Sequence, residues 1–290
     1  MHDAIRAMLS RYKCQTLDDH VNALREILQE LALLGLWRGK FFEHAAFYGG
    51  TALRVLHGMD RYSEDLDFSL LRPIPDFSIG VYGDALRREI GSFGFEVEFD
   101  RRLKTRATAI ESAFLKTNTF RELLRIEAKE DLDGKLHPGT QLKIKIEVDK
   151  YPPDGFATES RYILQPIPFP VRVYCLPDLF AGKMHAVLCR QWGKRVKGRD
   201  WYDLAWFAGR HPHLNVAHLE RRMRQSGHYN RIEPLDLAAV KAMLKNVIER
   251  LNVDQARAEV APYVSDRRAL EAWSHDFFED VIDRLISTDT

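Results

Sequence analysis

The stretch from Phe47 to Leu71, FYGGTALRVLHGMDRYSEDLDFSLL, most narrows what this chain can fold into. An apolar run ends at Gly49 and Gly50, a short helical segment follows, and Asp65-Leu66-Asp67 opens an apolar strand. Alternate side chains of a strand point to the same face. Asp65 and Asp67 are therefore predicted to stand side by side, while the leucine between them turns into the core.

Two adjacent carboxylates indicate a metal site, because they repel each other in a partly buried place unless a cation holds them. Mg²⁺ is typically bound by one or two carboxylates together with phosphate oxygens. The paired glycines let the backbone approach a ligand closely, and a helix that begins there directs N–H groups at an anion. A phosphate site and a metal site are predicted together, although a lone D-x-D is also typical of a solvated strand end.

The pattern GGTAL followed by R-x-S-E-D-L-D-F resembles the signature of the AbiEii-like toxin nucleotidyltransferases of type IV toxin–antitoxin systems. A second segment adds to the resemblance, with an A-x-K helix at Ala181-Gly182-Lys183 and an R-D-x-Y-D-L motif over Arg199–Leu204. The family belongs to the DNA polymerase β-like superfamily. The resemblance implies an α/β (α+β) fold, in which a nucleotidyltransferase core with a mixed sheet precedes a helical C-terminal bundle.

Hydrophobic spacing predicts the remaining elements. Residues 141–150, QLKIKIEVDK, alternate as a strand with one apolar and one charged face, and Phe95–Phe99 alternates in the same way. Residues 151–170 hold five of the 12 prolines and are predicted to form a loop. The expected domains are a core over 1–165 and a helical domain over 166–290 that completes the active cleft. Helices are predicted over Thr16–Trp37, Gly50–His57, Gly83–Phe93, Pro177–Trp192, Asp200–Gly209, Val216–Gln225, Leu235–Leu251 and Arg267–Ile286.

The resemblance assigns roles to residues at matching positions. Asp65, Asp67 and Glu147 are the expected metal ligands, with Asp149 as the alternative to Glu147; Gly49, Gly50, Thr51 and Ser63 are expected at the nucleotide. Lys183 is implied to contact a nucleotide phosphate, and its alternative is a surface lysine that extends from a helix. Asp200 either orients that lysine or acts as a base, and an N-cap is its structural alternative. Asp203 is expected to be a structural helper.

A cluster of cations stands out in a chain of net charge +1. Basic side chains bind phosphates and aromatic rings stack on bases, so the cluster indicates an RNA contact, against the alternative of a solvated loop. It comprises Arg190, Lys194, Arg195, Lys197 and Arg199, and Trp192 and Trp201 flank it.

The expected activity is transfer of a nucleoside monophosphate from an NTP, with Mg²⁺ or Mn²⁺, to an RNA acceptor such as the 3′ end of tRNA. Growth arrest relieved by a cognate antitoxin would follow. The alternatives are a protein or small-molecule acceptor, or a non-catalytic nucleotide-binding protein of the same fold.

The sequence also predicts a cytoplasmic location. Three cysteines without a secretory signal favour a reducing compartment, and no apolar run is long enough for a membrane span. His185 and Cys189 are four residues apart on one helical face, a spacing that permits a metal pair. With no third ligand in view, packing in the core is the prediction for both.

Overall fold

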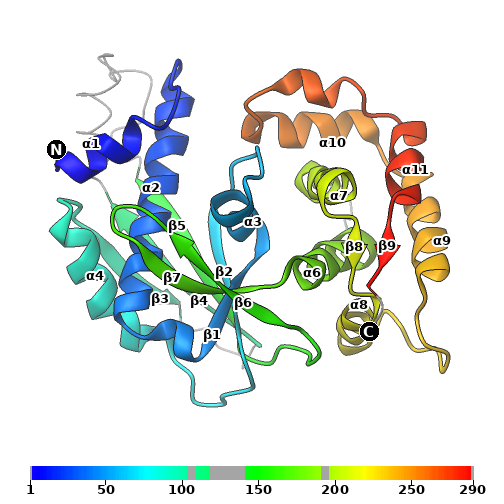
Figure 1. Cartoon of the computed structure of the whole chain (residues 1–290), viewed down its shortest axis with the longest axis horizontal. Helices are drawn as coiled ribbons and strands as arrows, with labels where there is room; N and C mark the ends of the chain where they lie inside the picture. Colours follow the sequence, from blue (N-terminus) through cyan, green and yellow to red (C-terminus); the bar gives the residue numbers. More distant parts are fainter. Residues whose placement is uncertain (1, 103–108, 118–140, 191–195, 289–290) are drawn as a thin grey trace. The chain divides into compact units, whose positions relative to one another are not determined.

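The structure is a computed structural model that describes residues 2–102, 109–117, 141–190 and 196–288. It divides into two compact units (Figure 1). The first unit consists of Met1–Gly58, Tyr62–Pro152 and Ser160–Val173, and the second of Met59–Arg61, Pro153–Glu159 and Tyr174–Thr290. The predicted division at residues 165 and 166 stays a prediction.

The first unit contains a mixed sheet of seven strands in its described part, in the order β3-β4-β5-β2-β1-β7-β6. Strand β2 occupies the centre, antiparallel to β1 and parallel to β5. This arrangement confirms the predicted α/β fold with the D-x-D on a central strand. The strands are β1 (Ala45–Tyr48), β2 (Asp65–Leu70), β3 (Glu98–Arg102), β4 (Ile110–Thr117), β5 (Leu142–Asp149), β6 (Thr158–Ile163) and β7 (Phe169–Tyr174).

The helices of this unit are α1 (Asp3–Leu9), α2 (Leu17–Arg38), α3 (Gly49–His57) and α4 (Gly83–Ser92). Helix α2 begins at a capping box, in which the Thr16 hydroxyl accepts from the Asp19 N–H at 3.2 Å and the Asp19 carboxylate accepts from the Thr16 N–H at 2.9 Å. Such a cap satisfies N–H groups that lack helical partners. The cap explains why the predicted start at Thr16 is correct.

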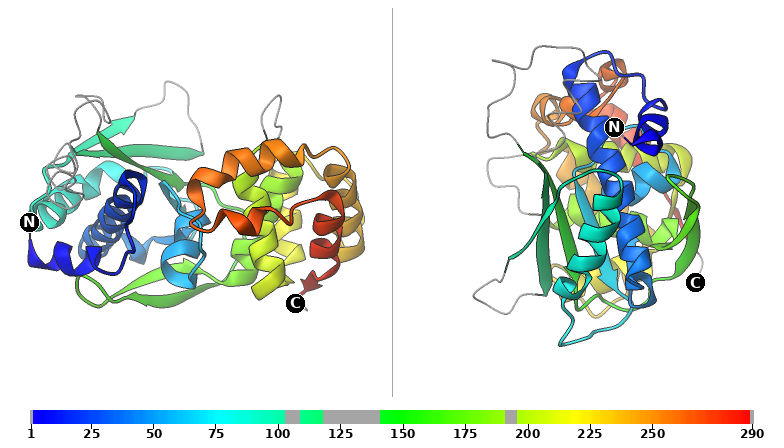
Figure 2. Two further views of the ribbon diagram at one scale, coloured as in Figure 1. Left: turned by 90° about the horizontal axis from the view of Figure 1, so that it is seen from above. Right: turned by 90° about the vertical axis from the view of Figure 1, so that its left-hand side faces the viewer.

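One face of the sheet carries the core. Figure 2 shows α2 and α4 side by side against the sheet. Gly35 of α2 allows this packing, because a Cβ there would lie only 3.2 Å from the Leu86 Cα of α4. Leu142, Ile144, Ile146 and Val148 of β5 are all at most 2% exposed, as their alternation predicts. The charged residues between them therefore lie on the opposite face.

Two predictions for this unit are wrong in part. Residues 151–170 do not form only a loop, since β6 and the start of β7 lie within them. Most of the prolines flank these strands, and β6 is at the edge of the sheet, where proline is tolerated. The strand predicted over Phe95–Phe99 begins only at Glu98, because Phe95 is 2% exposed and packs in the core ahead of the strand.

The second unit is mainly helical in its described part. The helix predicted over Arg267–Ile286 is wrong in its first half, because Arg267–Leu270 is a single 3₁₀ turn and a new helix begins after the Ser274 cap. The α-helices of the second unit are α6 (Leu176–Cys189), α7 (Gly198–Arg210), α8 (Val216–Gln225), α9 (Leu237–Ile248), α10 (Val253–Val260) and α11 (His275–Asp283). Two short strands, β8 (His213–Leu214) and β9 (Ile286–Ser287), pair with each other. Across the described ranges, no helix is both long and apolar enough to span a bilayer.

Candidate active site

The polar face of the central strands brings the predicted carboxylates together. Asp65 and Asp67 are half-buried on the same face of β2, and Leu66 between them is fully buried. The parallel register places Asp67 beside Glu147 of β5. The structure thus makes three acidic side chains neighbours across two hydrogen-bonded strands.

Strand register also separates Glu147 from its alternative. Asp149 stands two pairs further along, opposite Ser69, and its carboxylate accepts from the Tyr151 N–H at 3.0 Å. Glu147 accepts from the Ser112 hydroxyl at 3.2 Å and lies 2.7 Å from the Lys145 ammonium. Glu147 is therefore better placed than Asp149 to act with the two aspartates.

The three carboxylates are neighbours without converging. Among the described residues, one group of three His, Cys, Asp or Glu side chains has ligand atoms all within 4.8 Å of one another, and it lies elsewhere, on α6 and beyond α8. Like charges disfavour closer approach without a cation. Lys145 lies beside Glu147 and offsets part of that charge.

Gly49 fits closely against the Asp67 carboxylate. Gly49 has a φ of +83°, and a Cβ there would lie 2.4 Å from Asp67 Oδ2. Only glycine combines this left-handed backbone with such a close approach. Gly49 is also the first residue of α3, so the helix N-terminus, with its unpaired N–H groups, directly adjoins the D-x-D strand.

Two hydroxyl-bearing residues predicted at the nucleotide have structural contacts. Thr51 is fully buried, and its hydroxyl donates to the Asp65 carbonyl of β2. The glycine turn could bind a phosphate through the Thr51 hydroxyl or through its backbone N–H groups. Because the Thr51 hydroxyl already donates to Asp65, the contact favours the backbone. Ser63 accepts at its carbonyl from the Gln29 side chain of α2 at 3.1 Å, which fixes the segment that leads into β2.

Helix α3 is held in place through its second turn. The Arg54 guanidinium donates to Glu26 of α2 at 2.7 Å and stacks 4.5 Å from the Tyr62 ring. The Tyr12 hydroxyl donates to the other Glu26 oxygen at 2.8 Å. These contacts stabilise the orientation of α3 and hence of its N-terminus.

The second unit contains a buried cluster around Asp203 of α7. Asp203 is fully buried and accepts from Arg61 Nε at 2.6 Å and from Arg61 Nη2 at 2.7 Å. Lys183 Nζ of α6 lies 2.8 Å from the same carboxylate. Burial opposes ionisation, but the two cations outweigh it and lower the pKa of Asp203. Asp203 therefore orients Lys183, a contact that sequence reasoning considered for Asp200.

Asp200 has a different partner. Its carboxylate is 4% exposed and accepts from Arg190 at 3.2 Å. The N-cap alternative for Asp200 is wrong, because α7 begins at Gly198 and Asp200 lies in its first turn. Burial raises the pKa of Asp200 despite the neighbouring cations, which makes its carboxylate more basic than an exposed one.

The basic cluster is only partly available for phosphate. Arg190 pairs with Asp200, and Arg199 pairs with Glu259 at 3.2 Å and stacks 4.2 Å from a tyrosine ring. Burial lowers the pKa of Lys197. Lys194, Arg195 and Trp192 lie outside the described residues.

The stacking role predicted for Trp201 is wrong. Trp201 is 2% exposed, and its ring packs 4.9 Å from the ring of Phe278 in the helical core. A helix-period apolar face on α7 would have indicated this burial. Arg61 is the residue that sequence reasoning missed: it belongs to the R-x-S-E-D-L-D-F pattern, but nothing in its local sequence points to a partner on α7.

Comparison with known protein families gives one match. The family described as "Nucleotidyl transferase AbiEii toxin, Type IV TA system" matches residues 31–281. No curated protein matches the chain.

Two solved structures are similar over most of their length. One is a provisionally assigned nucleotidyltransferase from H. pylori, with a TM-score of 0.45 and 17% identity, covering 90% of this chain and 89% of that chain. The other is JHP933 from Helicobacter pylori, with a TM-score of 0.46 and 18% identity, covering 91% and 88%. Because the family match spans most of its length, this chain belongs to the AbiEii nucleotidyltransferase toxin family of type IV toxin–antitoxin systems.

Proposed function

We propose that this nucleotidyltransferase transfers a nucleoside monophosphate from an NTP to an RNA acceptor, with the 3′ end of tRNA as the candidate site, and thereby arrests growth until a cognate antitoxin acts. The observation that carries the proposal is the contact between Gly49 and Asp67. It places a helix N-terminus, a site suited to phosphate, against the edge of a carboxylate row suited to a metal.

The donor set fits Mg²⁺ or Mn²⁺. Asp65, Asp67 and Glu147 offer only carboxylate oxygens, which such ions prefer over the nitrogen and sulfur donors favoured by softer metals. These three residues would hold the ion. When bound, it supplies positive charge for the acceptor oxygen and for the leaving pyrophosphate. Gly49 leaves the Asp67 carboxylate in place, since any Cβ there would displace it.

The second unit contains a lysine and a carboxylate for which we propose roles. We infer that Lys183 contacts a nucleotide phosphate, because its ammonium retains 16% exposure while Asp203 fixes its position. Asp200, whose pKa burial raises, is our candidate for the group that takes the proton of the acceptor hydroxyl. Arg61 has a positioning role through Asp203.

The RNA acceptor rests on the toxin family and on the cluster from Arg190 to Arg199. The ion pairs of Arg190 and Arg199 favour the second candidate, a protein or small-molecule acceptor, because paired cations contribute less to phosphate binding.

The first experiment is incorporation of each of the four labelled NTPs, with Mg²⁺, into total cellular RNA. We expect one labelled RNA species with the wild-type chain and none with Asp65→Ala. Asp84→Ala is the matched control, because that carboxylate is 82% exposed on α4. Full incorporation by Asp65→Ala would refute the metal role of the strand, and absence of RNA labelling by the wild type would direct the search to protein and small-molecule acceptors.

A charge-removal variant distinguishes the acceptors. Changing Lys194, Arg195 and Lys197 to Gln leaves the paired Arg199 intact. An enzyme that acts on RNA should lose activity and show a weaker salt dependence, whereas a small-molecule enzyme should keep both. The control changes three exposed cations, Arg250, Arg267 and Arg268, to Gln.

Growth is measured in cells that express the wild-type chain or Asp65→Ala. We expect arrest with the wild type alone. An equal arrest by the inactive variant would separate toxicity from nucleotidyl transfer.

A further inference from the structure

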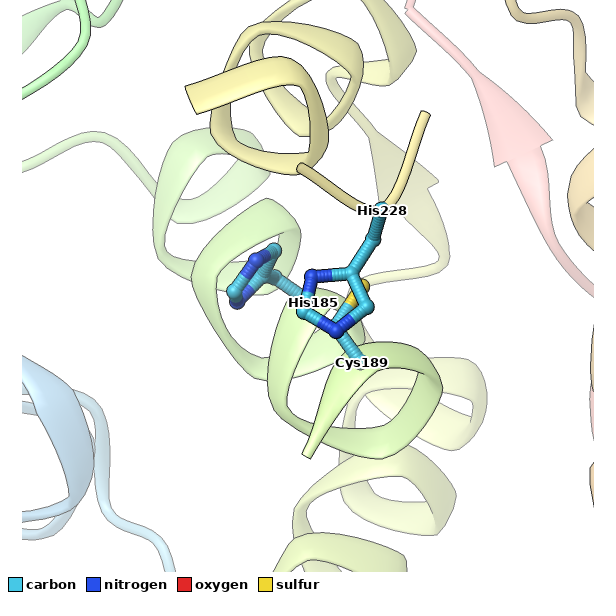
Figure 3. Close-up of side chains that lie close together, drawn as sticks. All are labelled: His185, Cys189 and His228. Carbon is cyan, nitrogen blue, oxygen red and sulfur yellow. The ribbon is translucent and has the colours of Figure 1, made fainter. Parts of the chain in front are cut away.

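The side chains of His185, Cys189 and His228 meet in the second unit (Figure 3). Each offers one ligand atom, and these atoms all lie within 4.8 Å of one another. His185 and Cys189 are one turn apart on α6. The sequence predicted only core packing for this pair because the third ligand lies beyond α8, far along the chain.

The end of α8 fixes the position of His228. The Gly227 N–H donates to the Arg224 carbonyl at 3.1 Å, and the His228 N–H donates to the Met223 carbonyl at 2.8 Å. Gly227 has a φ of +76°. These two hydrogen bonds and the left-handed glycine form a Schellman motif, which turns the chain so that His228 points back toward α6 (Figure 3).

Ser226 contacts both imidazoles, whose ring planes are perpendicular at a centroid separation of 6.2 Å. Its hydroxyl lies 2.8 Å from His185 Nε2 and 2.9 Å from His228 Nδ1. A single oxygen thus bridges one nitrogen of each ring. A metal ion placed between the rings would take over this bridging position.

We propose that His185, Cys189 and His228 form a binding site for a transition-metal ion of the Zn²⁺ class, separate from the carboxylates of the sheet. One thiolate and two imidazoles suit a borderline-soft ion. Mg²⁺ and Ca²⁺ prefer oxygen donors and are therefore not the expected ions. His228 is exposed and Cys189 is buried, so a fourth position faces solvent and accepts water. The ion would fasten the end of α6 to the end of α8.

The required rearrangement is small. Tetrahedral zinc with Zn–N near 2.0 Å and Zn–S near 2.3 Å needs ligand atoms roughly 3.5 Å apart. The ligand atoms now lie within 4.8 Å of one another, so they would have to approach by about 1 Å. Rotation of the side chains on a fixed backbone can supply this movement.

The charge state of the ligands sets the proton balance. Burial first, and then Arg222, His228 and Arg190, lower the pKa of His185 to about 4, so its ring is neutral at pH 7 and can coordinate. Burial raises the pKa of Cys189 to about 11, so the thiol must release its proton to solvent as the metal–sulfur bond forms. The resulting thiolate offsets one of the two positive charges of the ion.

Metal binding to the metal-free, tag-free full chain tests the proposal directly. Equilibrium dialysis against Zn²⁺ should give one tightly bound equivalent, and Co²⁺ should give a thiolate-to-cobalt charge-transfer band. His228→Ala should weaken Zn²⁺ binding by about tenfold or more, in line with the effects of disturbing a metal's ligand shell. Cys189→Ser should abolish the cobalt–thiolate band.

Two matched variants serve as controls. His213→Ala removes an exposed histidine of β8, and Cys14→Ser removes a half-exposed thiol of the first unit. Both should bind like the wild type. Three results would overturn the proposal: substoichiometric Zn²⁺ binding to the wild type, a decrease in Zn²⁺ affinity below about tenfold in His228→Ala, or a wild-type cobalt complex without the thiolate band. None of these readouts depends on nucleotidyltransferase activity.

Discussion

Replacement of Gly49 by alanine should disable the enzyme while leaving it folded. A Cβ at Gly49 would lie 2.4 Å from Asp67 Oδ2, whereas ordinary van der Waals contact begins at 3.4 Å. The Asp67 carboxylate must therefore move by about 1 Å, the order of displacement that lowers a rate about 100-fold when it misplaces a reacting group. That factor corresponds to about 2.7 kcal/mol of transition-state stabilisation.

Gly58→Ala is the matched control for this substitution. Gly58 lies at the other end of α3 with a φ of +70°, and a Cβ there would meet nothing within 4 Å. Both variants carry the cost of a left-handed alanine, roughly 1–2 kcal/mol of folding stability. Only Gly49→Ala adds the collision with the carboxylate, so the comparison isolates the close approach from backbone strain.

The assay pairs urea unfolding with initial rates of nucleotide incorporation at saturating Mg²⁺. We expect similar losses of unfolding free energy in the two variants and a rate about 100-fold lower in Gly49→Ala alone. If the rates of the two variants differ by less than about threefold, the contact with Asp67 does not position the carboxylate, and the reasoning fails.

Three further predictions follow from buried or neighbouring charges. Asp203→Asn leaves the cations that flank it without their counter-charge and should lower the free energy of unfolding by about 3–5 kcal/mol in urea titrations; a loss below about 1 kcal/mol would contradict its structural role. Glu147→Gln should reduce the initial rate by about 100-fold and Asp149→Asn by less than about threefold, because only Glu147 is level with the D-x-D pair; equal effects would reject this choice of the third carboxylate. Burial lowers the pKa of His218 from 6.5 to about 4, so the unfolded chain takes up a proton that the folded chain excludes, and stability falls as the pH drops from 6.5 toward 4. Between pH 7 and pH 5 the loss should be about 2 kcal/mol larger in the wild type than in His218→Gln, measured by urea unfolding, and parallel pH profiles of the two proteins would refute it.

Strict alternation made the central part of the site predictable from sequence. A strand that repeats apolar and charged residues has only one orientation that buries its apolar face. The alternation on β5 and on the first half of β2 therefore determined which side chains share the polar face, and the register then placed Asp67 beside Glu147. Local helix signals worked for the same reason, as the Thr16 cap of α2 illustrates.

Other features depend on contacts that local patterns do not encode. Tryptophans beside a basic run resemble a nucleic-acid surface in sequence, but Trp201 is buried because α7 packs in a helical core. The proline-rich segment before β7 gave a loop prediction, since proline signals chain breaks without revealing that the residues between breaks pair at a sheet edge. His228 reaches α6 only through the packing of two helices and the turn at Gly227.

The pairing of Arg61 with Asp203 best illustrates a contact that local sequence patterns do not encode. It also assigns a structural purpose to residues of the two family-like segments. The two residues are 142 positions apart, yet both lie within the segments that suggested the family. A guanidinium that is 3% exposed and a carboxylate that is 0% exposed stabilise each other, because a buried charge is costly when its partner is removed. Charged residues in these segments therefore differ in burial: Asp65 and Asp67 are half-buried on the polar face of β2, whereas Arg61 and Asp203 are buried and pair with each other. Asp203 connects this pair to Lys183, because the carboxylate that neutralises Arg61 also holds Lys183 in position. Loss of either partner of the buried pair should consequently impair nucleotide handling through Lys183 as well as folding.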